Sequence, residues 1–332
     1  MVNGKQSGIK VDIIVVGAGP AGCAAAIWGA YKGLKIALIE GRTSPNEKPG
    51  ESFHPGIFSI FRLLGIEDDI KNAEFLHYAG QFVNWGKTSE YQEFGTDANG
   101  PHLGIHAPRD KFESILLKRA IALGVDVKQP CKATSILCIN ERIVGVETSE
   151  GSIMGQIVVD ATGSRQWLAK QKKISINSLS QKLIAFYGYT GTDSLETEKR
   201  TFLEADNSGW TWIARIDSNR FAWTFIPFNN PKQKVRCPIK LKNSKTISAT
   251  KGADVTWRTT SKTAGLGFFI VGDAAATFDP LSSDGVLRAL ITGIKAADLS
   301  YSIVKNQDQE IQLINYYRNW CEELFNSELE KH

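Results

Sequence analysis

The stretch Gly17-Ala18-Gly19-Pro20-Ala21-Gly22 decides the fold of this 332-residue chain. An apolar run over 11–16 precedes it, and a run of small residues typical of a helix follows it to about Tyr31. A second apolar run over 35–39 then ends at Glu40. A strand, a glycine turn, a helix and a strand form one βαβ unit, and an acid at this distance completes the pattern of dinucleotide-binding proteins. We therefore predict an α/β fold with a Rossmann-like domain.

The glycines of this turn have separate physical tasks. Gly17 permits the tight turn, Gly19 lets the backbone approach a pyrophosphate, and Gly22 allows the helix to pack closely. The helix N-terminus then faces the phosphates, and Glu40 can accept hydrogen bonds from the ribose hydroxyls. The candidate cofactor site also includes Ala21, Gly41 and Arg42. A glycine-rich turn in a packed βα unit is the alternative, and the motif alone does not separate NAD from FAD.

The composition is that of an ordinary globular protein, with 42% hydrophobic and 22% charged residues. The net charge is only +4 and the basic residues are scattered, which argues against nucleic-acid binding. The five cysteines form no CxxC pair, so we expect no metal site and a reducing compartment such as the cytoplasm. The uncharged run over 13–30 is broken by Gly19-Pro20. We interpret it as the first βα unit, and not as a signal peptide or a membrane span.

Hydrophobic patterning predicts a nucleotide-binding domain that is interrupted by a β-rich one. The expected elements are helices near 57–64 and 110–123, a β-meander over 133–159, aromatic-rich strands over 183–257, and two long closing helices from about 284 and about 308. We assign the nucleotide-binding domain to 1–72, 101–180 and 258–332, and the β-rich substrate domain to 73–100 and 181–257.

A second segment, at 272–285, distinguishes the two dinucleotides. It reads Gly-Asp-Ala-Ala-Ala-Thr-Phe-Asp-Pro-Leu-Ser-Ser-Asp-Gly and follows an apolar strand at 267–271. Asp273 would sit at the strand end, where it could bond the ribityl hydroxyls of FAD. A helix from about Asp284 would aim backbone N–H groups at the flavin N1–C2=O edge. A helix cap for Asp273 and an ordinary turn at Pro280 are the alternatives. We predict FAD, held here by Gly272, Asp273, Pro280, Ser283 and Gly285.

On these motifs the chain resembles the aromatic-hydroxylase class of FAD monooxygenases, with a domain of the glutathione-reductase type. Within that class it resembles the branch of tryptophan halogenases and geranylgeranyl reductases. Gly50-Glu51-Ser52 is similar to a halogenase loop, and Phe82-Val83-Asn84-Trp85 is similar to a halogenase strand. The resemblance implies further FAD contacts from Glu51, Ser52, Arg109, Val127, Ala161 and Gly163.

The departures from the halogenases are as informative as the matches. His77 stands where those enzymes carry a lysine, and Ser282 stands where they carry an active-site glutamate. Their Trp-x-Trp-x-Ile-Pro signature is half present, because Trp210-Thr211-Trp212 is followed by no Ile-Pro. Since the lysine makes or holds the hypohalous species, we predict that chlorination is lost.

The chemistry that remains is that of the flavin itself. Reduced FAD and O₂ supply an electrophilic oxygen that suits electron-rich rings. His77 is the first candidate for a proton relay and His54 the second, although a hydrogen-bonded strand histidine is the alternative for His77. The candidate substrate cavity is lined by Trp85, Trp210 and Trp212, although alternate aromatic residues on a strand can also be plain packing.

The electron donor and the substrate are expected to come from outside the chain. The sequence holds no second GxGxxG in a βαβ setting, so NAD(P)H would dock transiently or act through a separate flavin reductase. The chain also resembles the small flavoproteins that mature cysteine tryptophylquinone amine oxidases. Since this sequence is shorter than the halogenases, we expect their helical cover to be missing, which would leave the flavin open to a tryptophan of a precursor oxidase. The alternatives are a small-molecule aromatic hydroxylase, a prenyl-lipid reductase, and a non-catalytic flavin-binding chaperone.

Overall fold

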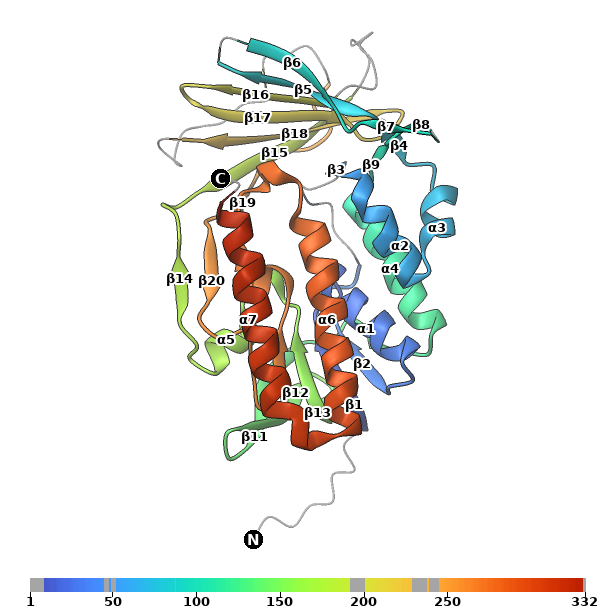
Figure 1. Ribbon diagram of the computed structural model, residues 1–332, viewed down its shortest axis with the longest axis vertical. Helices are drawn as coiled ribbons and strands as arrows, with labels where there is room; N and C mark the ends of the chain where they lie inside the picture. The colour runs from blue at the N-terminus through green and yellow to red at the C-terminus, as the bar shows by residue number, and fades with distance from the viewer. Residues whose placement is uncertain are drawn as a thin grey trace.

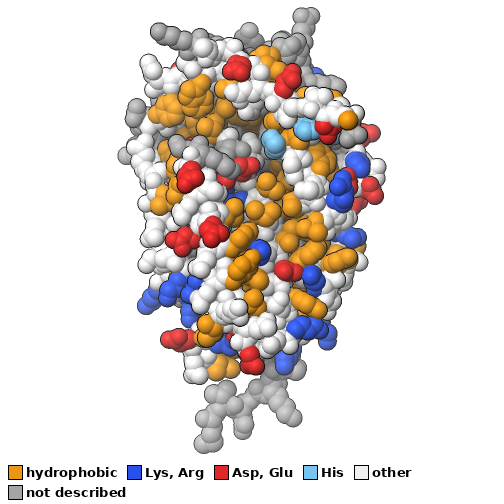
Figure 2. All heavy atoms as spheres, in the orientation of Figure 1, with side chains coloured by type: hydrophobic (Ala, Val, Ile, Leu, Met, Phe, Trp, Pro, Cys, Tyr) orange, Lys and Arg blue, Asp and Glu red, His pale blue; other side chains and the backbone are white. Residues whose placement is uncertain are grey.

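The computed structural model describes residues 9–44, 48, 52–86, 88–98, 100–191, 201–228, 238 and 245–330. A broad sheet lies across one end of the molecule, and two long helices run beneath it (Figure 1). These helices are α6 (Gly285–Lys305) and α7 (Glu310–Leu329). On the face shown in Figure 2, apolar side chains form a band along the middle, with charged side chains on both sides of it. The fold class is the mixed α/β fold that the sequence predicts.

The opening βαβ unit forms the centre of the larger sheet. β1 (Ile9–Val16) lies parallel to both β2 (Ile36–Ile39) and β13 (Gly151–Asp160). The whole of β2 is buried, as expected for a parallel strand that is covered on both faces. Between β1 and β2 the chain forms α1 (Pro20–Tyr31), whose small residues are largely buried.

Strands far apart in the sequence complete this sheet, whose main order is β10-β2-β1-β13-β12-β11 with β22 beside β13. The additional strands are β10 (Asp126–Lys128), β11 (Ala133–Ile139), β12 (Arg142–Thr148), β21 (Ala264–Gly265) and β22 (Phe268–Ile270). The predicted meander is therefore present as β11, β12 and β13. Its last strand also belongs to the parallel core, because β13 pairs with β1 and β22.

The second large sheet has seven strands in the order β19-β15-β18-β17-β16-β5-β6. They are β5 (Gly80–Trp85), β6 (Thr88–Glu93), β15 (Ile184–Gly191), β16 (Thr201–Asp206), β17 (Gly209–Arg215), β18 (Arg220–Pro227) and β19 (Lys251–Asp254). Neighbouring side chains alternate between its faces. Trp210 accordingly packs in a different apolar cluster from Ile213.

Smaller elements connect the two large sheets. The short strands are β3 (Ser52–Phe53), β4 (Leu76–Tyr78), β7 (Thr96–Asp97), β8 (Gly100–Pro101), β9 (Gly104–His106), β14 (Ile176–Ser178), β20 (Arg258–Thr260) and β23 (Ala276–Thr277). The remaining α-helices are α2 (Phe58–Leu64), α3 (Glu67–Asn72), α4 (Arg109–Ala122) and α5 (Trp167–Gln171). No helix in the described part of the chain is long and apolar enough to cross a membrane.

Helices α1 and α6 approach each other closely because small residues face each other. A Cβ added at Gly293 of α6 would lie 2.2 Å from the backbone oxygen of Ala21 in α1. A Cβ added at Gly29, by contrast, would meet only the tip of the Ile36 side chain at 2.9 Å. The first contact is with backbone and cannot relax without moving a helix, whereas a side-chain tip can rotate away.

We expect Gly293→Ala to lower the free energy of unfolding by about 2 kcal/mol, because the added methyl group pushes α6 away from α1. The matched control is Gly29→Ala, where the higher helix propensity of alanine, worth about 1 kcal/mol, offsets the smaller clash. Urea unfolding of both variants measures the difference. Equal stabilities would contradict the assigned packing.

Candidate functional site

A cavity of about 840 Å³ lies where the ends of the parallel strands meet the seven-stranded sheet. One part of its wall comes from the ends of β1, β2 and β13 and from the first turns of α1 and α6. The other part comes from β15 to β19 of the seven-stranded sheet. Ligands in open α/β sheets bind at this edge, outside the carboxyl ends of the strands.

Each glycine of the turn has a different structural environment. Gly17 has a φ of +106°, and a Cβ there would lie 2.4 Å from the backbone oxygen of Ala161. A Cβ at Gly22 would lie 1.8 Å from the oxygen of Gly17. At Gly19, by contrast, no heavy atom lies within 4 Å of the added Cβ. Gly17 and Gly22 are thus required by the packing of the protein, while Gly19 leaves open space toward the cavity.

Two of the helices that begin at the cavity, α1 and α6, lack a side-chain cap. Gly19 is the N-cap of α1 and Asp284 the N-cap of α6, and neither helix has a side-chain hydrogen bond at its cap. Gly285 lines the cavity and has no neighbour within 4 Å of an added Cβ. Free N–H groups and the helix dipole make such ends suited to phosphate or to a flavin edge that gains negative charge.

Glu40 has a structural task besides the predicted one. Its carboxylate accepts hydrogen bonds from the Ala18 N–H at 2.9 Å, and from the N–H and the Nε of Arg42 at 2.9 and 3.0 Å. Burial by itself would raise the pKa of Glu40, but these hydrogen bonds outweigh it and lower the pKa below its ordinary value. Glu40 therefore stays ionised and braces the glycine turn. Nη2 of Arg42 donates a fourth hydrogen bond at 3.3 Å, so the roughly four acceptor sites of the carboxylate are all used, and a ribose hydroxyl would have to replace one of the Arg42 contacts.

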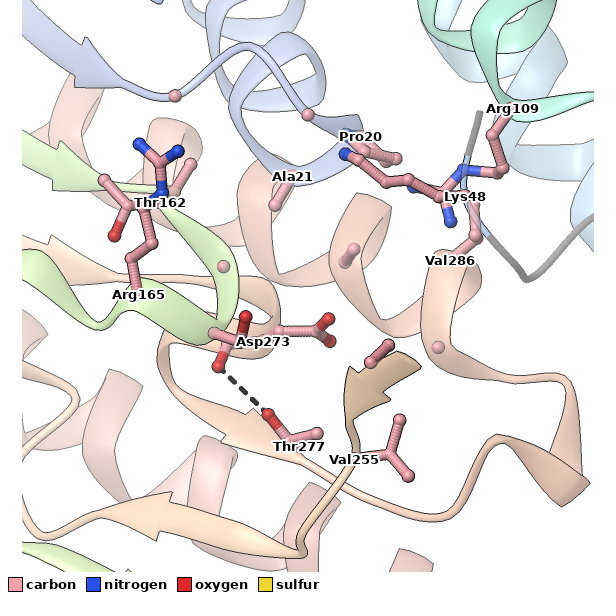
Figure 3. Close-up of a pocket in the computed structure, with 18 of the residues that line it drawn as sticks. Pro20, Ala21, Lys48, Arg109, Thr162, Arg165, Val255, Asp273, Thr277 and Val286 are labelled. Carbon is pink, nitrogen blue, oxygen red and sulfur yellow. Dashed lines mark hydrogen bonds between the residues drawn. The ribbon is translucent and has the colours of Figure 1, made fainter. Parts of the chain in front are cut away.

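Asp273 lies in a short 3-10 turn, three residues after the end of β22, and is exposed at the cavity wall. The Thr277 hydroxyl donates to its backbone oxygen at 3.3 Å, as the dashed line in Figure 3 marks. This bond holds the turn while the Asp273 carboxylate is left at the cavity wall. That placement suits hydrogen bonds from ribityl hydroxyls, so the residues at this end of the cavity fit FAD.

Lys48 is a cavity residue that sequence reasoning missed. Its Nζ lies 3.4 Å from Oε1 of the buried Glu113, and Nη2 of Arg109 lies 2.7 Å from the same oxygen. Figure 3 shows the Lys48 and Arg109 side chains close together above Val286. Burial lowers the pKa of Lys48, Glu113 opposes that shift, and Arg109 adds to it. Two cations thus share one carboxylate, which favours an anionic group here.

Most of the predicted cofactor residues line the cavity. They are Gly17, Gly19, Ala21, Glu40, Gly41, Arg42, Ser52, Arg109, Ala161, Gly163, Asp273, Pro280, Ser283 and Gly285. Three others lie outside its wall. Gly22 and Gly272 pack between helices and turns, and Val127 lies on the edge strand β10. Glu51 lies outside the described residues.

Of the predicted catalytic and substrate residues, only Trp210 and Trp212 line the cavity. His77 is exposed on β4, because its neighbour Tyr78 takes the inward side of the strand. His54 is also exposed and accepts a hydrogen bond from the Gly56 N–H at 3.3 Å. Trp85 is 48% exposed, at the end of β5 beside the turn to β6. The structure therefore gives these three residues no contact with the candidate site.

A different histidine adjoins the cavity wall. His106 is 3% exposed, its Nδ1 lies 3.0 Å from Ser52 Oγ, and its Nε2 lies 2.8 Å from Thr201 Oγ1. Burial lowers its pKa to about 3, so the imidazole is neutral near pH 7. Its only sequence signal is its place in a short apolar strand just before Arg109.

Comparison with known proteins settles the family. Residues 10–265 match the FAD binding domain model. The chain belongs to the FAD binding domain family. Its matches place it among the FAD-dependent oxidoreductases of the halogenase, hydroxylase and reductase superfamily.

The relatives come from more than one of these groups. The flavin-dependent halogenase armH3 of Armillaria mellea is 27% identical, over 92% of this chain and 70% of that protein. The digeranylgeranylglycerophospholipid reductase of Picrophilus torridus is 26% identical, over 96% of this chain and 84% of that protein. The solved structure of the flavin-dependent brominase Bmp2 is 22% identical with a TM-score of 0.84, covering 94% of this chain and 83% of the brominase. That likeness shows the same fold.

Gly19→Val tests the cofactor cradle. The φ of Gly19 is −73°, which valine adopts, and the space beside it is open, so we expect the variant to fold. The side chain would fill the approach to the pyrophosphate and raise the dissociation constant of FAD roughly a hundredfold or more, about 3 kcal/mol. Fluorescence titration of the apoprotein with FAD measures this. Gly29→Ala is the control, and unchanged FAD affinity in Gly19→Val would contradict the assigned role.

The burial of His106 predicts a pH dependence of stability. The folded-state pKa of about 3 is below the ordinary 6.5, so below pH 6.5 the unfolded chain binds a proton that the folded one does not. The contribution of His106 is therefore complete above pH 6.5 and falls by up to about 1.4 kcal/mol per pH unit below it. In urea unfolding from pH 7 to pH 4, the advantage of the wild type over His106→Gln should shrink. A constant advantage would contradict this account.

Proposed function

We propose that this chain is an FAD-dependent monooxygenase that hydroxylates an electron-rich aromatic ring. The proposed substrate is a tryptophan side chain of a precursor amine oxidase, in the biogenesis of its tryptophylquinone. The observation that supports this proposal is that one cavity has the candidate flavin site, or cofactor cradle, on one side and a wall with aromatic side chains on the other. Asp273 and the N-terminus of α6 lie in the cradle, and Trp210 and Trp212 lie in the wall.

The bound flavin, once reduced, supplies with O₂ an electrophilic oxygen for ring hydroxylation. The residues of this chain would stabilise charge, bind the ring and exclude water. The N–H groups that open α6 stabilise negative charge at the ring edge of the cofactor. Trp210, Trp212 and Leu203 pack together in the apolar part of the cavity wall, against which an indole can pack and displace water. The choice of a precursor oxidase as the carrier of that indole rests on the motif resemblance.

Trp212→Leu tests the substrate wall. Trp212 is partly buried and lines the cavity, so we expect its loss to raise KM roughly tenfold and to divert reducing equivalents to H₂O₂. Trp85→Leu is the matched control, because Trp85 lies outside the cavity wall. Product and H₂O₂ are measured per NADH consumed. Equal effects of the two substitutions would contradict the assigned wall.

The reaction itself is tested with an unmodified precursor quinoprotein amine oxidase. The FAD-loaded protein, NADH and a flavin reductase are incubated with the precursor under ¹⁸O₂, and the target peptide is weighed. We expect incorporation of ¹⁸O and faster NADH-dependent O₂ consumption when precursor is present. No oxygen gain under turnover would overturn the proposal. A chaperone would leave O₂ consumption unchanged, and a reductase would form product from a prenyl lipid without O₂.

Halogenation is the second candidate, since armH3 and Bmp2 are by name a halogenase and a brominase. Lys48 supports it, because this lysine lines the cavity while His77, at the position of the halogenase lysine, does not. Its pKa supports halogenation as well, because burial lowers the pKa of Lys48 despite the ion pair with Glu113, and the free amine is the nucleophilic form. Adding bromide to the same incubation decides: a brominated product would favour halogenation over hydroxylation.

A further inference from the structure

Four buried polar side chains form a connected cluster behind the cavity wall. Ser52 is on β3, Tyr78 on β4, His106 on β9 and Thr201 at the start of β16. His106 bonds Ser52 and Thr201 through its two ring nitrogens, and the Tyr78 ring stacks on the His106 ring. Of the four, Ser52 alone lines the cavity. The cluster therefore ends in one hydroxyl at the place where the cofactor is held.

The cluster is tightly packed as well as hydrogen-bonded. The Tyr78 and His106 rings stack with centroids 4.1 Å apart and planes inclined by 15°. Gly104 lies beneath Tyr78, and a Cβ there would approach its ring to 2.7 Å. Thr201 is 0% exposed, and Ser52 is 8% exposed. Thr201 is closed off from solvent, so its hydroxyl proton needs an acceptor within the cluster.

Counting donors fixes the direction of every bond. Within the described part of the chain, Thr201 Oγ1 has one partner, His106 Nε2. If Thr201 accepted from an Nε2–H, its own buried proton would lack an acceptor, which costs about 1–3 kcal/mol. Thr201 therefore donates to Nε2. The neutral imidazole then carries its single proton on Nδ1 and donates it to Ser52 Oγ.

Ser52 Oγ is the acceptor of the Nδ1 proton. In the described part of the chain, His106 is the one hydrogen-bond partner that the structure gives to Ser52 Oγ. Tyr78 covers the cluster from the other side, because its ring stacks on His106, and burial raises its pKa to about 12, so the phenol is neutral near pH 7. The proton of Ser52 is left for a group in the cavity.

We propose that Ser52 Oγ is an obligate hydrogen-bond donor to an acceptor atom of the bound FAD, and that His106 and Thr201 are positioning residues that enforce this direction. The role involves no net proton transfer. This role requires FAD binding but not oxygenase activity. The proposed role of Ser52 can therefore fail while the proposed function stands, and the proposed function can fail while the role of Ser52 stands.

The first test is FAD binding by apoprotein variants, followed by fluorescence titration and by the visible absorption band of the bound flavin. Ser52→Ala and His106→Leu should each raise the FAD dissociation constant roughly three- to tenfold, the loss of one hydrogen bond. The double variant should be no weaker than Ser52→Ala alone. Ser52→Thr and His106→Gln should retain near wild-type affinity, because a Gln amide can donate to Ser52 and accept from Thr201.

Three binding results would overturn the proposal. They are wild-type affinity in Ser52→Ala, equal losses in His106→Gln and His106→Leu, and additive losses in the double variant. If His106→Leu does not fold, Thr201→Val replaces it, since valine preserves the shape and removes only the proton that fixes the tautomer. We expect this variant to weaken FAD binding although Thr201 does not line the cavity. Wild-type affinity in a folded Thr201→Val would contradict the enforced direction.

The second test reads the tautomer directly. In the ¹⁵N-histidine spectrum of the FAD-loaded protein, the signals that disappear in His106→Gln belong to His106. A protonated Nδ1 and an unprotonated Nε2 are expected near pH 7. The opposite tautomer would overturn the proposal.

Discussion

The close approach of α1 and α6 is the constraint on which the rest of the molecule depends. A helix N-terminus binds anionic groups only over a short distance, so two of them serve one ligand only if the helices are in contact near their first turns. Gly293 of α6 provides that contact against the backbone of Ala21, and Gly22 lets the first turn of α1 lie against the backbone of Gly17. Larger residues at these positions would separate the two ends of the cofactor cradle, even if every polar residue of the site were kept.

The polar groups around this cradle divide between bracing the protein and meeting the ligand. Glu40 joins the glycine turn to Arg42, and the buried Asp160 accepts from the backbone N–H groups of Thr162 and Leu168. Asp273 and the helix ends, in contrast, keep hydrogen-bonding capacity toward the cavity. The braces hold the open groups in place, so the cofactor meets a surface that needs little rearrangement.

Sequence patterns placed more of the predicted cofactor residues than of the predicted catalytic and substrate residues on the cavity wall. Gly17, Gly19 and Asp273 follow directly from local patterns, because a glycine turn or a strand end positions its own residues. Whether His77 reaches the cavity depends on which face of its strand points inward, and a one-residue change of register would reverse that orientation. Whether Trp85 reaches the cavity depends on where its strand ends. His106 and Lys48 were missed for a related reason. Their environments are made by Thr201 and Glu113, which are distant in the sequence.

The parallel pairing of β5 with β16 has a consequence for the order of folding. Gln81 lies opposite Thr201, so the two strands are separated by more than a third of the chain. The cradle likewise joins α1 to α6, near opposite ends of the sequence. Such contacts close late and slowly during synthesis, since every intervening residue must first leave the ribosome. The two sides of the cradle can therefore come together only after α6 has been synthesised, long after the first βαβ unit.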